Sequence, residues 1–223
     1  MILVLVAAGG ASAPSAAALA PLEAEVVSLE ELAAEPSALH DPGFERSELT
    51  VSGRRVRVGD LTGVVNLVPA VPPELLTFYD EEERDYQAAE LHAWLSFFLS
   101  SLRCRVVNRP TPVSLTGPAL TALSWIRLAR AAGILTAPLT VDSRDVRAAL
   151  RGPEPDGDDV VCLGGRVVSP ASRSDPSAVR LAEAVGVTYL RAWFDRDSRL
   201  LGATSVPDLR PESTRRALAD YLA

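Results

Sequence analysis

The basic side chains of this chain are all arginine: its 22 basic residues include no lysine. Arginine presents a planar fork of N–H donors that pairs with two oxygens of a carboxylate or phosphate, whereas lysine offers a mobile point charge. The chain therefore has the groups to bind phosphate or carboxylate in a fixed geometry. It has no lysine to follow a phosphate group as that group moves.

The cysteines and histidines carry the next most reactive groups, and their spacing predicts no metal site. Cys104 and Cys162 each lie in an apolar, strand-like run, which is typical of buried, reduced thiols in a cytoplasmic protein. His40 and His92 are far apart in the sequence, and no Cys-x-x-Cys pair or Cys/His cluster occurs. We therefore expect no zinc centre.

Two short motifs have both an ion-binding and a structural interpretation. The acidic run 80–83 would attract a cation, but its charges share one helical turn and are typical of a helix start. The turn Gly9-Gly10 would offer an anion the N-terminus of a following helix. It lacks the GxGxxG spacing of dinucleotide sites and an acidic partner for the ribose. The structural interpretation is favoured for both motifs.

Composition and charge bound the class of protein. A chain that is 48% hydrophobic and 23% charged is typical of a globular protein rather than a disordered one. The net charge of −7 disfavours nucleic acid as a partner, because such binding needs a basic surface. The apolar N-terminus lacks the basic leading segment of a signal peptide and predicts a buried strand instead. No apolar run reaches the ~18 residues of a membrane span, so we expect a cytoplasmic protein without a membrane partner.

Hydrophobic patterning predicts a chain of alternating strands and helices. Continuous apolar runs are typical of parallel strands covered on both faces, and alternation around a glycine is typical of a hairpin. In the first half we expect strands over 2–8, 24–29, 63–68 and 104–108, a hairpin over 48–58, and helices over 14–22 and 80–102. In the second half we expect helices over 119–132, 143–150, 176–185 and 211–222, a linker over 152–159, a hairpin over 159–169, and strands over 187–194 and 200–204.

Three segments carry a family resemblance. Residues 103–140, RCRVVNRPTPVSLTGPALTALSWIRLARAAGILTAPLT, resemble the junction before the nucleotide-binding domain of ATP-grasp carboxylate–amine ligases, especially RimK-like enzymes that act on peptides. DDVVCLGGRVVSPASR is similar to the strand–turn–strand that leads to a nucleotide- or metal-contacting arginine in that family. AVRLAEAVGVTYLRAWFD and RLLGATSVPDLRP are similar to the following helix and strand and to the closing strand.

The resemblance implies an α/β fold in two parts. Residues 1–110 would form a small parallel-sheet, pre-ATP-grasp-like domain, and residues 111–223 a shortened, truncated α+β ATP-grasp-like domain. ATP and Mg²⁺ are the ligands that it implies where the site is retained. In that case the candidate nucleotide-binding residues are Arg109, Arg166 and Arg173, and the candidate metal ligand is Asp195.

The sequence departs from the family pattern at three places. Residues 116–118 read Thr-Gly-Pro where the family has a lysine near the helix start. Only about 18 residues separate positions 140 and 159, where the family has several strands, a lysine and a Gly-rich loop. The closing strand reads Gly-Ala-Thr at 202–204 in place of the Glu-x-Asn that binds magnesium. Activation of a carboxylate by ATP needs those charges on the transferring phosphoryl group.

We therefore expect a degenerate, non-catalytic ATP-grasp-like protein without a bound cofactor. It would act as a binding or scaffold partner of a peptide-modifying enzyme, with a protein or peptide partner and as a homo- or hetero-oligomer. The first alternative is an active ATP-dependent carboxylate–amine ligase, in which Arg109, Arg166, Arg173 and Asp195 converge on one cleft. The second is a small-ligand-binding protein that uses the turn Gly9-Gly10.

Overall fold

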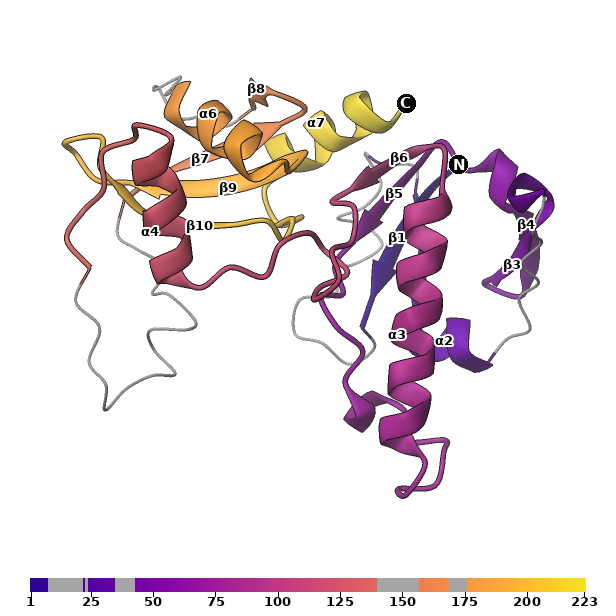
Figure 1. Ribbon diagram of the computed structural model, residues 1–223. Helices are drawn as coiled ribbons and strands as arrows, with labels where there is room; N and C mark the ends of the chain where they lie inside the picture. Colours follow the sequence, from indigo (N-terminus) through magenta and orange to yellow (C-terminus); the bar gives the residue numbers. More distant parts are fainter. Residues whose placement is uncertain (8–21, 23, 35–42, 140–156, 169–175) are drawn as a thin grey trace. The chain divides into compact units, whose positions relative to one another are not determined.

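The described residues of the computed structural model form two compact units (Figure 1). The structure describes residues 1–7, 22, 24–34, 43–139, 157–168 and 176–223. Unit 1 comprises Met1–Gly117 and Leu209–Ala223, and unit 2 comprises Pro118–Asp208. The C-terminal segment thus packs with unit 1, and the division into domains 1–110 and 111–223 stays a prediction. The helices expected over 14–22 and 143–150 and the turn Gly9-Gly10 lie outside the described residues.

Unit 1 contains a four-stranded parallel sheet, as the apolar runs predict. Its strand order is β2-β1-β5-β6, formed by β1 (Ile2–Val6), β2 (Ala24–Ser28), β5 (Gly63–Asn66) and β6 (Arg105–Val107). All three strand pairings are parallel. Every residue of β1 is buried, which is the reason for its unbroken apolar sequence. The expected hairpin is also confirmed, as β3 (Glu48–Val51) pairs with β4 (Arg54–Arg57).

Two α-helices, α2 (Leu29–Ala34) and α3 (Arg84–Ser101), complete the first part of unit 1. Helix α3 begins four residues later than the acidic run suggests. The peptide N–H of Glu83 donates to the carbonyl of Asp80 at 2.9 Å, so residues 80–83 form a turn ahead of the helix. Tyr86, in the first turn of α3, is 64% exposed and therefore lies outside the buried face of the helix. Short 3₁₀ helices cover Phe44–Arg46, Val58–Asp60 and Pro73–Leu75.

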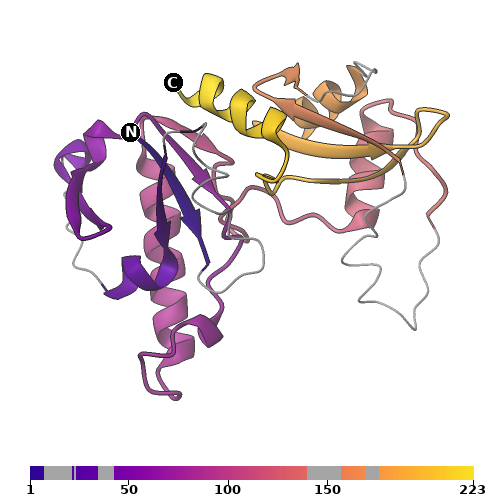
Figure 2. The same cartoon turned by 180° about the vertical axis from the view of Figure 1, so that it is seen from behind.

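The described residues of unit 2 form an antiparallel sheet and two helices. The strand order is β10-β9-β7-β8, formed by β7 (Asp158–Leu163), β8 (Arg166–Val167), β9 (Tyr189–Phe194) and β10 (Leu200–Thr204). Helices α4 (Ala122–Ala131) and α6 (Pro176–Val185) cover one face of this sheet, as the views from both sides show (Figures 1 and 2). Their apolar side chains share one core with Leu190, Ala192 and Phe194 of β9.

The terminal helix α7 (Glu212–Leu222) belongs to unit 1 and packs on its sheet. A Cβ added to Gly63 of β5 would lie 2.8 Å from the side chain of Leu222, so the absence of a side chain at Gly63 permits this approach. The guanidinium of Arg105 donates to the carbonyl of Tyr221 and lies 4.8 Å from the centre of that ring. No helix among the described residues has the length and apolar character needed to cross a bilayer.

We expect Gly63→Ala to lower the free energy of unfolding by about 1–3 kcal/mol, because the new methyl group overpacks the contact with Leu222. Urea denaturation followed by circular dichroism measures the change. Gly202→Ala is the matched control, since its Cβ would lie 3.8 Å from Trp193 in ordinary contact. A loss from Gly63→Ala that is not reduced in the background of Leu222→Ala would contradict the proposed packing.

Candidate functional site

The face of the unit 2 sheet opposite α4 and α6 holds the chemically informative side chains. Successive side chains of a strand point to opposite faces. Leu190, Ala192 and Phe194 of β9 enter the core, so Tyr189, Arg191 and Trp193 lie on the other face. This second face is the candidate functional site.

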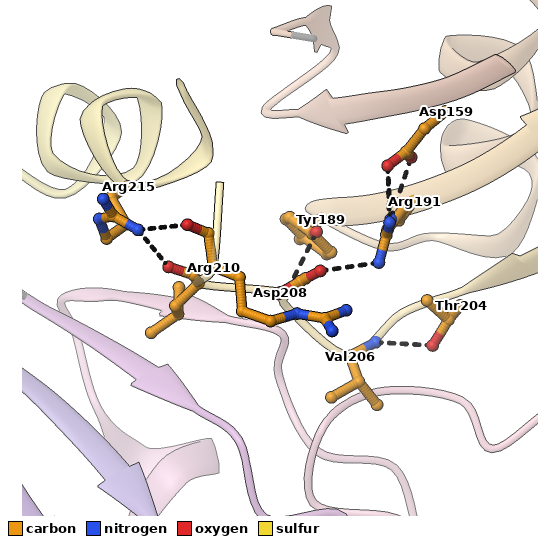
Figure 3. Close-up of polar contacts among 9 residues, drawn as sticks. Asp159, Tyr189, Arg191, Thr204, Val206, Asp208, Arg210 and Arg215 are labelled. Carbon is orange, nitrogen blue, oxygen red and sulfur yellow. Dashed lines mark hydrogen bonds and ion pairs between the residues drawn. The ribbon is translucent and has the colours of Figure 1, made fainter. Parts of the chain in front are cut away.

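Arg191 lies between two carboxylates on this face (Figure 3). Its Nε atom lies 3.0 and 2.9 Å from the two carboxylate oxygens of Asp159, and its Nη2 atom lies 2.7 Å from Oδ2 of the same residue. Its Nη1 atom donates to Oδ2 of Asp208 at 2.8 Å. The side chains of Arg191 and Asp208 are only 15% and 14% exposed. The side chain of Asp159 is 35% exposed. The guanidinium therefore neutralises part of the charge of one mostly buried acid and one partly exposed acid, and this trio carries a net charge of −1.

Tyr189 extends this network by a hydrogen bond with the backbone of Asp208. Its hydroxyl oxygen accepts a hydrogen bond from the peptide N–H of Asp208 at 3.2 Å, and the ring is fully buried. Burial raises the pKa of Tyr189 to about 12, since desolvation penalises the phenolate. The hydrogen bonds to Asp159 raise the pKa of Arg191, so this guanidinium stays charged. Within the network, Tyr189 therefore keeps its proton and Arg191 its charge over the physiological pH range.

The closing strand β10 contributes side chains without charge to the same face. Its register places Gly202 opposite Trp193 and Thr204 opposite Arg191. The hydroxyl of Thr204 accepts from the peptide N–H of Val206 at 3.2 Å, and the guanidinium of Arg191 lies 5.2 Å from the centre of the Trp193 ring. The positions that resemble the family's Glu-x-Asn therefore flank Arg191, but they offer no carboxylate. No three His, Cys, Asp or Glu side chains of the described ranges are grouped to hold a metal ion.

Arg109, a candidate nucleotide ligand, lies in unit 1 and contacts the C-terminal end of α3. One guanidinium nitrogen donates to the carbonyls of Leu99 and Ser100 at 3.3 and 3.2 Å. The other donates to the carbonyls of Leu102 and Cys104 at 2.9 and 3.3 Å. The last carbonyls of a helix have no partner within the helix. A cation at this end is also stabilised by the negative end of the helix dipole. This arrangement gives Arg109 a structural use for both terminal nitrogens.

Arg166 and Asp195 lie at opposite ends of the sheet. Arg166 of β8 pairs with Leu163, which pairs with Tyr189 at the start of β9, whereas Asp195 follows the last residue of β9. Six residues of strand separate these ends by roughly 20 Å. The carboxylate of Asp195 accepts from the peptide N–H groups of Asp197 and Arg199 at 2.9 and 2.8 Å and so organises the β9–β10 turn. Arg173 lies outside the described residues.

The sequence interpretation did not select Asp159, Tyr189, Arg191 or Asp208. The available signal was an arginine at the centre of the apolar strand TYLRAWF. A charge in a mostly buried strand needs a partner of opposite charge, and the alternation of the strand places it on the face away from the helices. Its partners are 32 and 17 residues distant, so no local spacing identifies them.

Comparison with known proteins gives structural matches alone. No protein-family model and no curated protein matches the chain. The ATP-grasp ligase PsnB complexed with minimal precursor matches with a TM-score of 0.66 at 16% identity, over 99% of this chain and 97% of that chain. The macrocyclase MdnB from Microcystis aeruginosa MRC matches with a TM-score of 0.65 at 14% identity, over 100% and 98% of the two chains.

A third match is the RiPP-associated ATP-grasp ligase of Chryseobacterium gregarium in complex with ADP and a leader and core peptide. Its TM-score is 0.58 at 10% identity, over 99% of this chain and 96% of that chain. These similarities confirm the resemblance at the level of fold: the chain has an ATP-grasp-like fold over its full length. At such identities they show the fold and leave the chemistry to the residues.

We expect Arg191→Met to destabilise unit 2 by about 3 kcal/mol, because it removes the shared cationic partner of Asp159 and of the mostly buried Asp208. Thermal and urea denaturation measure the loss. Arg199→Met removes an arginine whose ion pair with Asp197 is 46% and 68% exposed, so we expect less than about 1 kcal/mol. Equal losses in the two variants would show that the network is not a stabilising element.

Stability should fall as pH rises from 10 to 12, because Tyr189 keeps its proton in the folded chain while the unfolded chain loses it. A pKa of about 12 against the ordinary value of 10 corresponds to a loss of about 2–3 kcal/mol. No lysine titrates in this window. Burial also raises the pKa of Cys104 and Cys162, so Tyr189→Phe is the control that isolates the tyrosine. An unchanged pH slope in Tyr189→Phe would contradict the assignment.

Proposed function

We propose that this chain is a non-catalytic ATP-grasp-like protein that binds a protein or peptide partner and serves a peptide-modifying enzyme. The observation that carries this proposal is the guanidinium of Arg191 between the carboxylates of Asp159 and Asp208. One of the two negative charges that these carboxylates would offer to a divalent cation is already balanced by Arg191, and both carboxylates accept hydrogen bonds from it. Arg191 therefore takes the place beside these carboxylates that a bound cation would otherwise occupy.

The donor set on this face does not fit Mg²⁺. Magnesium takes hard oxygen ligands in a near-octahedral arrangement, mostly from carboxylates and water. Oxygens of the carboxylates of Asp159 and Asp208 accept hydrogen bonds from Arg191, and Gly202 has no side-chain oxygen to offer. ATP-dependent activation of a carboxylate depends on neutralising the transferred phosphoryl group, so we derive no catalytic step through a metal here.

A peptide is the partner class that the structural neighbours support. Two of them are complexes with such partners: PsnB with a minimal precursor, and the macrocyclase MdnC with the precursor peptide MdnA. The PsnB structures with Mg and ADP also show that this fold accommodates nucleotide in that protein. For this chain we propose that peptide binding is retained and that nucleotide chemistry is lost. We also propose that the chain forms a homo- or hetero-oligomer. Light scattering at micromolar concentration tests the self-association part of this proposal, and a monomer would contradict it.

The alternative, an active ligase with an arginine-based nucleotide site, has less support. It requires Arg109, Arg166, Arg173 and Asp195 to meet in one cleft. Arg109 donates to four carbonyls at the end of α3, and Arg166 and Asp195 lie at opposite ends of one sheet. Arg166 is exposed and therefore accessible to a phosphate.

We expect titration of the chain with MgATP to millimolar concentration to give no saturable heat and no shift in melting temperature. Isothermal titration calorimetry and a thermal-shift assay measure the two quantities. A saturable, magnesium-dependent heat would overturn the non-catalytic proposal. If Arg166→Ala then abolished that heat and Arg199→Ala, at the other end of β9, did not, the active-ligase alternative would take its place.

A further inference from the structure

A groove of about 300 Å³ lies in unit 1, between α2 and α3, on elements separate from the site described above. Leu32 of α2 and Leu76 form its buried apolar part, and both are at most 6% exposed. One stripe of α3 lines the other side, and it includes Leu91 and Trp94. Figure 1 shows α2 beside α3. The volume is at the lower end of the range for ligand pockets, which suits one or two side chains of a peptide.

Aromatic rings give this groove a surface that attracts both apolar groups and cations. Tyr79 and Trp94 line it. Trp94 stacks on Phe98 with the ring centres 5.4 Å apart, and this stacking supports its orientation. Phe78 lies 4.6 Å from the ring of Tyr79 and is 49% exposed, so the aromatic surface continues beyond the groove. The faces of such rings bind ammonium and guanidinium groups as well as aliphatic side chains.

The polar members of the groove add negative charge. Glu90 lines it together with Gln87, one turn earlier on α3. Within the described residues, neither Glu90 nor the acids of the preceding turn, Glu81–Glu83, have an ion-pair partner. The basic residue in this stretch, Arg84, donates through Nε to the carbonyl of Tyr79 at 3.1 Å. An apolar recess beside the unpaired carboxylate of Glu90 is complementary to a cationic, partly apolar ligand.

We propose that this groove binds a basic peptide segment, in which an aliphatic or aromatic side chain fills the recess and a neighbouring arginine or lysine contacts Glu90 and the aromatic rings. This inference rests on the proposed function, because it takes the partner to be a peptide. It adds the place of binding and the chemistry of the peptide. Charge complementarity selects this occupant, since a chain of net charge −7 repels acidic segments.

The test begins with panning a phage-displayed random dodecapeptide library against the immobilised full chain. We expect the selected peptides to be enriched in arginine or lysine next to leucine, isoleucine or aromatic residues. The most enriched peptide is then synthesised with a fluorescent label, and its anisotropy is titrated against the wild type and two charge-reversal variants. Glu90→Lys should weaken binding at least tenfold. Asp220→Lys, the matched control at an exposed position of α7, should change it less than twofold.

Three results would overturn the inference: no enrichment of basic residues, purely apolar or acidic selected peptides, or equal effects of the two variants. Self-association that Glu90→Lys abolishes would assign the groove to a second copy of the chain and would also overturn it. The nucleotide titration separates this inference from the proposed function. If the chain binds MgATP and also selects basic peptides, the groove assignment stands and the non-catalytic proposal is overturned. If it binds no MgATP and selects no basic peptides, the non-catalytic proposal stands and the groove assignment is overturned.

Discussion

Unit 2 depends on one constraint: the positive charge of Arg191, in the middle of strand β9, must be paired with carboxylates. Arg191 lies in β9, and its side chain is only 15% exposed, so its guanidinium requires acceptors at short distance. One comes from Asp159 of β7, the neighbouring strand, and the other from Asp208, beyond the end of β10. The network therefore ties β7 and the segment after β10 to β9, on the face opposite α4 and α6. The apolar core on the other face stabilises the sheet without specifying these partners.

The sequence predicted the strands and most helices because their signals are local. Helix α6 begins and ends at the expected residues, Pro176 and Val185, and strand β10 covers the expected Leu200–Thr204. Helix α4 ends ahead of Gly133, whose φ of 70° suits a glycine. The start of α3 was misplaced because acidic residues favour a helix N-terminus and a preceding turn alike. The return of α7 to unit 1 depends on a contact between Gly63 and Leu222, which no local pattern reveals.

The side chains of the site were harder to predict than the fold, because a polar residue has several ways to satisfy its hydrogen bonds. Arg109 suits a phosphate as well as it suits the carbonyls at the end of α3. Asp195 suits a metal ion as well as it suits the peptide N–H groups of a tight turn. Sequence gives the donor or acceptor, and the tertiary structure selects the partner. The network of Arg191 was missed for the same reason, since its partners are brought together only by strand pairing.

This separation between core and site means that the fold can persist while the polar side chains on one face of the sheet differ. The core of unit 2 is built from the side chains of β9 that face α4 and α6, and substitutions on the opposite face leave that packing intact. A different set of polar side chains on that opposite face would therefore alter ion binding at little cost in core packing. Peptide binding at the groove of unit 1 would depend on a different set of elements. Loss of nucleotide chemistry in one unit and retention of a docking surface in the other are thus physically compatible in one chain.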